Sequence, residues 1–192
     1  MTKTQQPLVS IITINYNEVD ATLDLLASLR DIGYTNKEVI VVDNASKVSP
    51  QKAIKAEFPE VKLIMSDENL GFAGGNNLGI KEAKGDYLLF INNDAVITEG
   101  TIEKLIETFE KNPDAGIVSP KFHFYNKPGI VEYAGYSDMN SFTGRNTTIG
   151  SGETDKGQYD QMSVTHFCHG GGMMVPRHVI EKVGPIPEEY FL

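Results

Sequence analysis

The sequence predicts an α/β protein in which three layers, α/β/α, form around a mostly parallel central sheet. Short apolar runs bounded by turn residues alternate with segments of helical periodicity up to about Pro120. The run Tyr87–Ile91 is apolar throughout, which is typical of a strand buried on both faces of a parallel sheet. Alternating strands and helices with short connections are the pattern of a doubly wound sheet.

Five short apolar runs are expected to form strands, and helices with apolar side chains at helical spacing connect them. Asn17 is expected to cap the first helix, Ser49-Pro50 to open the second and Thr98 to cap the fourth, since these residues favour helix amino ends. The expected strands are Val9–Ile14, Val39–Val42, Val61–Met65, Tyr87–Ile91 and Ile117–Ser119.

A glycine-rich segment, Gly71–Gly75, is expected to form a flexible loop that leads into a helix over about Asn76–Ala83. Glycine lets a ligand approach the backbone closely, and a helix amino end favours an anionic ligand. The alternative is a tight loop that needs glycine dihedral angles for its own geometry. Both interpretations stay open at this point.

Beyond Pro120 the strand–helix alternation ends. Residues 122–125 and 130–134 are expected to form two short paired strands. Residues 140–162, which are rich in Gly, Ser, Thr and Asp, are expected to form a mobile surface loop. A further strand is expected over residues 163–167 and a final helix over residues 176–184. We expect residues 1–192 to form a single domain.

Composition limits the classes of partner. The 192 residues, 40% hydrophobic and 22% charged, describe an ordinary soluble globular protein. A net charge of −9 argues against nucleic acid or an anionic membrane as the main partner. A single cysteine, Cys168, and a polar amino terminus favour the cytoplasm. No apolar run approaches the ~20 residues that span a bilayer, so we expect no transmembrane segment in this chain, while peripheral association with the inner membrane face stays open.

Polar residues directly follow three of the expected strands. Asn15-Tyr16-Asn17 follows the first, Asp43-Asn44 the second and Asn92-Asn93-Asp94 the fourth. The carboxyl ends of parallel strands meet at one edge, where open α/β sheets bind ligands. We therefore expect a ligand site there, although each cluster alone also suits a turn or a helix cap.

Asp94 is the expected metal ligand. A carboxylate is a hard oxygen donor, and Mg²⁺ held by one or two carboxylates usually completes its shell with substrate phosphates. His166, Cys168 and His169 are close in sequence, but structural zinc normally needs four ligands and no second pair exists. We expect no dedicated zinc site, and we expect His169 to lie near the ligand crevice.

Four ordered motifs together resemble the family 2 inverting glycosyltransferases, which have the nucleotide-diphosphosugar transferase (GT-A) fold, and the rhamnosyltransferase-like members most of all. Neither the Gly-x-Gly-x-x-Gly fingerprint after the first strand nor a P-loop motif is present. The resemblance covers about residues 7–192, with the motifs at residues 9–17, 39–46, 69–77 and 90–94.

By this resemblance, the donor is a nucleotide-diphosphate sugar (a UDP-, dTDP- or GDP-sugar). The acceptor is a glycan or lipid-linked hydroxyl in bacterial surface-polysaccharide or cell-wall glycan synthesis. Mg²⁺ or Mn²⁺ on Asp94 would neutralise charge on the leaving diphosphate. The implied nucleotide-sugar residues are Ile14, Asn15, Tyr16, Asn17, Asp43, Asn44, Gly71, Gly74, Gly75, Asn77, Asn92 and Asn93, with His169, Gly170, Gly171 and Gly172 on the acceptor and sugar side.

The resemblance also implies a division of the chain and two departures from the family pattern. Residues 7–119 would form the nucleotide-sugar-binding half, and 120–192 the start of the acceptor-side half. Asn92 replaces the first aspartate of Asp-x-Asp, so metal affinity without nucleotide should be weak. The general base of the family follows a segment resembling Pro187–Leu192, so we expect the base beyond Leu192 and the chain to be truncated before it.

Two other functions stay open. One is a binding module that holds nucleotide sugars without turnover. The other is a sugar-phosphate nucleotidyltransferase, although such enzymes usually carry a basic, glycine-rich loop after the first strand, where this chain has Asn15–Glu18.

Overall fold

A five-stranded sheet with the order β3-β2-β1-β4-β7 forms the centre of the computed structural model, which describes residues 6–189. Strands β1 to β4 run parallel, and β7 pairs antiparallel with β4 at the edge. The predicted mostly parallel sheet is therefore confirmed. The strands are β1 Val9–Asn15, β2 Lys37–Asp43, β3 Lys62–Met65, β4 Tyr87–Ile91 and β7 Gly172–Pro176, with a separate hairpin of β5 Phe122–His123 and β6 Val131–Tyr133.

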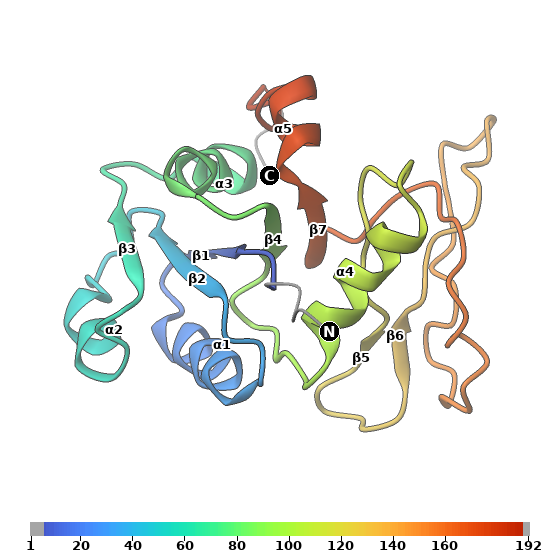
Figure 1. The fold of residues 1–192 in the computed structure, drawn as a ribbon, viewed down its shortest axis with the longest axis horizontal. Helices are drawn as coiled ribbons and strands as arrows, with labels where there is room; N and C mark the ends of the chain where they lie inside the picture. Colours follow the sequence, from blue (N-terminus) through green and yellow to red (C-terminus); the bar gives the residue numbers. More distant parts are fainter. Residues whose placement is uncertain (1–5, 190–192) are drawn as a thin grey trace, which may run out of the picture.

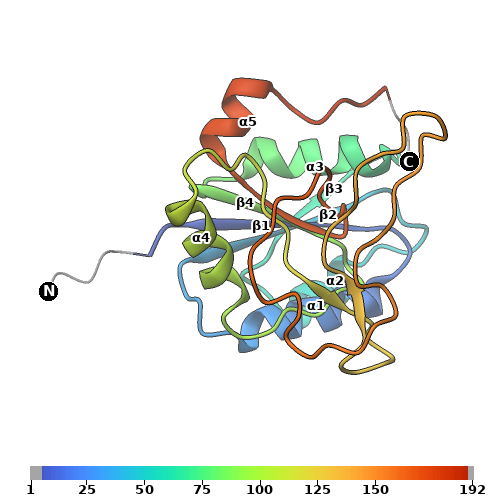
Figure 2. The same ribbon diagram turned by 90° about the vertical axis from the view of Figure 1, so that its right-hand side faces the viewer.

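Helices cover both faces of the sheet and complete three layers (Figure 2). On one face, apolar side chains of α1, α2 and α4 pack in a core that includes Leu25, Phe58 and Ile102. On the other face, α3 and α5 pack over Ile12 and Leu88. Within residues 6–189, no helix is long and apolar enough to cross a membrane. The helices are α1 Val19–Asp31, α2 Gln51–Glu57, α3 Gly71–Glu82, α4 Thr101–Lys111 and α5 Arg177–Val183.

The register of the parallel strands brings their carboxyl ends to one level. Asn15 pairs with Asp43 across β1 and β2, and Ile12 pairs with Phe90 across β1 and β4. If the pairing of β1 with β4 is continued for three residues beyond Ile12 and Phe90, Asn93 lies level with Asn15. The sheet alone therefore brings together the three polar clusters that follow β1, β2 and β4.

Residues 136–165 form an exposed arm of turns and isolated bridges beyond the β7 edge, beside the β5–β6 hairpin (Figure 1). The bridges join Tyr136 to Thr148 and Asn140 to Arg145. The predicted surface position of residues 140–162 is confirmed, whereas their mobility stays a prediction.

Three predicted helix caps are wrong. The cap position of α1 is Glu18, because Asn17 adopts a left-handed φ of 61° and its side chain accepts the Lys47 N–H at 2.8 Å. Gly100, with a φ of 79°, caps α4 in place of Thr98. Pro50 takes the cap position of α2, and the neighbouring Ser49 hydroxyl accepts only a long 3.4 Å bond from the backbone.

Two predicted strands are also wrong. Residues 117–119 make a single bridge, Val118 to Met174, on the outer side of β7. Pro120 follows at once and cannot donate to a ladder, so the pairing stops. Residues 163–167 form no strand, and the Tyr136 N–H is bonded to the Thr165 hydroxyl at 2.8 Å rather than to a backbone carbonyl of this segment.

The predicted flexible loop at Gly71–Gly75 is wrong, because these residues form the first turns of α3. A Cβ at Gly75 would lie 2.9 Å from Ile14 Cδ1, and one at Gly79 would lie 2.4 Å from Ile12 Cγ2. Glycines on this side of α3 therefore let the helix axis lie close to β1. Only Gly71 has a left-handed φ, 65°, where the chain enters the helix.

Replacing Gly79 with Ala tests this close packing. Alanine alone would favour the helix by about 1 kcal/mol over glycine. The clash with Ile12 should reverse the sign, so we expect the free energy of unfolding to fall by about 1–3 kcal/mol in urea denaturation. Gly116→Ala is the matched control, since a Cβ there meets nothing within 4 Å. A Gly79→Ala protein as stable as the wild type would contradict the packing argument.

Candidate functional site

Asn15 and Asp43 lie opposite each other at the carboxyl ends of β1 and β2. Asn15 Nδ2 donates to Asp43 Oδ1 at 2.7 Å, and the Ser46 hydroxyl donates to the same oxygen at 2.6 Å. The Ser46 backbone N–H donates to Asp43 Oδ2 at 3.2 Å. Only 1% of Asn15 and of Asp43 is exposed, so this carboxylate has its polar partners inside the protein, as a buried charge requires.

A threonine on α1 extends these bonds to the end of β4. The Thr22 hydroxyl donates to Asn15 Oδ1 at 2.9 Å and accepts a hydrogen bond from Asn93 Nδ2 at 3.1 Å. Thr22 is fully buried. Asp43, Asn15, Thr22 and Asn93 thus form one continuous chain of hydrogen bonds, here called the strand-end network. It links the three polar clusters that the sequence placed after separate strands.

Asp94 is exposed, as are Tyr16 and Asn92 at this edge, whereas Asn15 and Asp43 are buried. No hydrogen bond or ion pair joins the Asp94 carboxylate to another group among residues 6–189. In the same range, no group of three or more His, Cys, Asp or Glu side chains is arranged to hold a metal ion. A divalent ion at this edge would therefore depend on the Asp94 carboxylate together with oxygens from a ligand, which is how Mg²⁺ is often held beside phosphates.

Asn44 and Asn77 are buried and bond to the backbone of the protein itself. Asn44 accepts the Leu70 N–H at 3.0 Å and donates to the Gly71 carbonyl at 3.1 Å, which fixes the entry to α3. Asn77 donates to the Ile186 carbonyl at 2.8 Å and accepts the Ile186 N–H at 2.9 Å. Both side chains thus hold parts of the fold together, and their contact with a ligand stays a prediction.

An open pocket of about 470 Å³ adjoins the strand-end network through Asn15. Its volume falls within the range of small-molecule sites, roughly 300–1,000 Å³. Tyr16 is 45% exposed at the same strand end, although it does not line the pocket. The lining residues come from the end of β1, the connection into α1, the first residue of α1, and α2 with the turn before it: Asn15, Asn17, Val19, Val48, Ser49, Pro50, Lys52, Ala53 and Ala56.

The segment before β7 brings His169 and its glycines next to the end of β4. The Gly171 carbonyl accepts the Asn92 N–H at 3.0 Å. A Cβ at Gly172 would lie 2.6 Å from the Phe122 ring, so protein packing already requires a glycine there. Gly170 is exposed, and its approach to a sugar stays a prediction.

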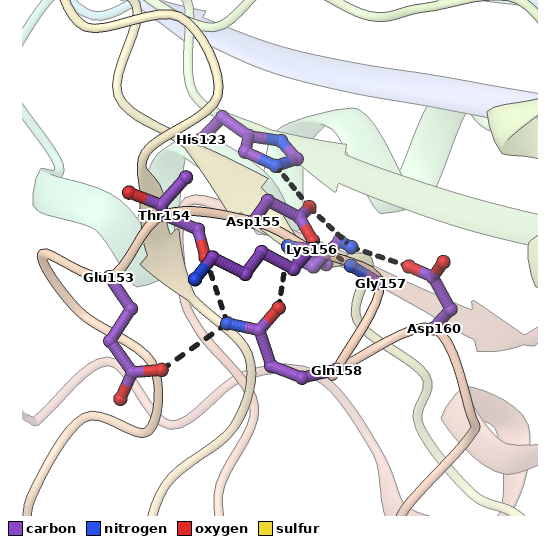
Figure 3. Close-up of polar contacts among 9 residues, drawn as sticks. His123, Glu153, Thr154, Asp155, Lys156, Gly157, Gln158 and Asp160 are labelled. Atoms are coloured by element: carbon purple, nitrogen blue, oxygen red, sulfur yellow. Dashed lines mark hydrogen bonds and ion pairs between the residues drawn. The ribbon is translucent and has the colours of Figure 1, made fainter.

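A second polar cluster, separate in its hydrogen bonds from the strand-end network, holds residues 153–160 against β5 and is drawn in Figure 3. Asp155 Oδ2 lies 2.6 Å from both Lys121 Nζ and His123 Nε2, and Asp155 Oδ1 accepts the Gly157 N–H at 2.9 Å. The Lys121 ammonium above all, followed by the Gly157 N–H and His123, holds the pKa of the Asp155 carboxyl well below its usual range. Lys121 also pairs with Asp160 at 2.7 Å, so the charged groups of this cluster are paired with one another.

Sequence reasoning missed Thr22 and Ser46. Thr22 lies three residues after Val19 on the face of α1 that packs on the sheet, where a polar residue needs a buried partner. Ser46 follows Asp43 by three residues, a spacing at which serine and aspartate often bond across a turn. Both signals are weak without the sheet register that brings the partners together.

A sequence profile described as Glycosyl transferase family 2 matches residues 10–184. The chain belongs to this family. YwdF of Bacillus subtilis (strain 168), described as an uncharacterized glycosyltransferase, is 34% identical over 149 residues, which are 70% of this chain and 54% of YwdF. A poly-β-1,6-N-acetyl-D-glucosamine synthase of Staphylococcus epidermidis is 31% identical over 135 residues, which are 66% of this chain and 32% of the synthase.

The chain thus spans about half, or less, of these family 2 relatives. Among solved structures, the mannosyltransferase PcManGT from Pyrobaculum calidifontis, in complex with GDP-Man and Mn²⁺, matches with a TM-score of 0.66 at 21% identity. The match covers 97% of this chain and 49% of that protein. Such an identity shows the fold, and the predicted GT-A fold is confirmed.

Removing the Thr22 hydroxyl tests the strand-end network. Thr22→Val keeps the shape of the side chain and leaves the Asn15 and Asn93 amides short of a partner. We expect the free energy of unfolding, measured in urea, to fall by about 1–3 kcal/mol. Thr22→Ser keeps the hydroxyl and should lose about 1 kcal/mol or less, the value of one buried methyl group. Equal losses in both variants would show that the hydroxyl bonds contribute nothing.

Proposed function

We propose that this chain is the donor-binding part of an inverting, metal-dependent glycosyltransferase that transfers a sugar from a nucleotide-diphosphate sugar to an acceptor hydroxyl. One observation carries the proposal: the strand-end network joins the ends of β1, β2 and β4 and leaves the Asp94 carboxylate exposed beside it. This is the edge of an open α/β sheet at which ligands bind.

The nucleoside is proposed to lie at the ends of β1 and β2. The exposed Tyr16 ring offers a face for the base, and the pocket lined by Asn15 and Asn17 offers a concave surface beside it. Asp43 is too enclosed to move, so its proposed task is to hold the Asn15 amide in one orientation. UDP-, dTDP- and GDP-sugars all remain donors to be tested.

Mg²⁺ or Mn²⁺ is the proposed cofactor, and the residues present fit it. Asp94 is exposed and Asn92 adds an amide at the same turn, whereas the Asp43 carboxylate is already bonded to Asn15 and Ser46. A bound ion would neutralise charge on the departing nucleoside diphosphate. The chain's own contribution is to orient Asp94 through the bond between Asn93 and Thr22.

The pathway class follows from the relatives rather than from the site. The synthase from Staphylococcus epidermidis is named for a polysaccharide, poly-β-1,6-N-acetyl-D-glucosamine. We propose that the present chain likewise serves the synthesis of a bacterial surface polysaccharide or cell-wall glycan, with a glycan or lipid-linked acceptor.

Replacing Asp94 with Asn tests the metal role. It removes the exposed carboxylate and preserves the shape of the side chain. Affinity for a nucleoside diphosphate in Mn²⁺, measured by calorimetry with UDP, dTDP and GDP, should fall by about 10- to 100-fold, or ~1.4–2.8 kcal/mol. Stability without ligand should change by less than about 0.5 kcal/mol, as for other exposed positions.

Asp114→Asn is the matched control, since Asp114 is an exposed aspartate in the turn after α4. It should leave both affinity and stability unchanged. The opposite pattern for Asp94→Asn, lower stability with unchanged affinity, would assign Asp94 to the turn and remove it from the metal site. A folded wild-type chain that binds none of the three diphosphates in Mn²⁺ would overturn the proposed function itself.

A further inference from the structure

Three aromatic rings lie next to the His169 imidazole, and no other histidine among residues 6–189 has such contacts. The His169 ring centroid lies 5.0 Å from that of Tyr133, 5.3 Å from that of Phe122 and 6.2 Å from that of Tyr136. The Tyr136 ring is nearly parallel to it, at an angle of 17°. Contacts at these distances are favourable and directional, so three rings restrict the imidazole to one orientation.

The second constraint on His169 is a hydrogen bond within its own loop. The Gly171 N–H donates to His169 Nδ1 at 3.0 Å. A ring nitrogen that accepts a hydrogen bond carries no proton, so the neutral imidazole must carry its proton on Nε2. His169 is half-buried, and its Nε2 has no hydrogen-bond partner among residues 6–189. The loop therefore presents one oriented and unused N–H donor.

The imidazole of His169 lies close to the turn that carries Asp94. A Cβ at Gly171 would be 2.7 Å from His169 Nδ1 and 3.6 Å from Asn92 Nδ2, so the Gly171 backbone lies between the imidazole and the Asn92 amide. The Gly171 carbonyl also accepts the Asn92 N–H at 3.0 Å, which fixes this spacing. Any larger residue at 171 would push the imidazole away from the turn.

We propose that His169 Nε2–H donates a hydrogen bond to the β-phosphate of the bound nucleotide, an inference that rests on the proposed function. The turn supplies a single exposed carboxylate, Asp94, because Asn92 stands at its first position. An oriented N–H from the β7 side adds a second point of charge stabilisation on the diphosphate. Hydrogen bonds to charged groups are among the strong ones in proteins.

Two variants of His169 test the roles of the two ring nitrogens separately. In His169→Asn the side-chain oxygen replaces Nδ1 and accepts the Gly171 N–H, but no group reaches the Nε2 position. In His169→Gln the amide N–H reaches that position. Calorimetry in Mn²⁺ compares the nucleoside monophosphate, the diphosphate and the diphosphate sugar of whichever base the wild-type chain binds. Thermal melting of both variants checks that the fold is kept.

We expect His169→Asn to lower the affinity for the diphosphate and the diphosphate sugar alike, by about 10-fold or more, with the monophosphate within about 2-fold. His169→Gln should recover most of the loss. His166→Gln is the matched control, because His166 is exposed and, within the described part of the chain, pairs only with Asp138, at 2.6 Å. It should bind all three compounds as the wild type does.

Four results would overturn the proposal. Unchanged diphosphate affinity in His169→Asn would remove His169 from the nucleotide site. A loss confined to the diphosphate sugar would place the N–H on the sugar, and an equal loss for the monophosphate would place it on the α-phosphate or nucleoside. A wild-type chain that binds no nucleotide overturns the proposed function and this inference with it, so the two failures are distinguishable.

Discussion

The hydrogen bond between Asn15 and Asp43 is the interaction on which the rest of the site depends. It joins β1 to β2 where both strands end, and both side chains are buried. An ionised carboxylate in such a position is tolerated only with strong partners, which Asn15 and Ser46 supply. With its N–H₂ group committed to Asp43, the Asn15 amide must present its oxygen to Thr22. The orientation of one amide thus determines how the turn after β4 is anchored.

Close packing of α3 serves the same edge of the sheet. The glycines of α3 let it approach β1, with Gly75 against Ile14 and Gly79 against Ile12. Asn44 fixes the start of α3 to the end of β2. β7 fixes the other side, because Gly171 and Gly172 pair with Asn92 and Ile91 at the end of β4. The exposed Asp94 is therefore carried by a turn that is anchored on both sides.

Periodicity and turn chemistry correctly predicted the central sheet and the meeting of three polar clusters at one edge, because buried strands are continuous apolar runs and polar residues end them. The same reasoning failed at Gly71–Gly75, where glycines signalled a loop but served helix packing against side chains that only the folded structure brings near. It also failed at Asn17, whose side chain accepts the Lys47 N–H, and at Thr98, because α4 begins only after Gly100. Thr22 was missed because its partners, Asn15 and Asn93, are brought together only by the register of the sheet.

The chain belongs to family 2 and has the GT-A fold, and the proposed function depends on a link between the strand-end network and a metal–diphosphate. Anomalous diffraction from Mn²⁺ in crystals of the chain grown with a nucleoside diphosphate tests that link most directly. The account predicts one manganese peak coordinated by the Asp94 carboxylate and the diphosphate oxygens, with the nucleoside toward Tyr16. A bound nucleotide whose manganese lies away from Asp94, or one bound at another edge of the sheet, would contradict it.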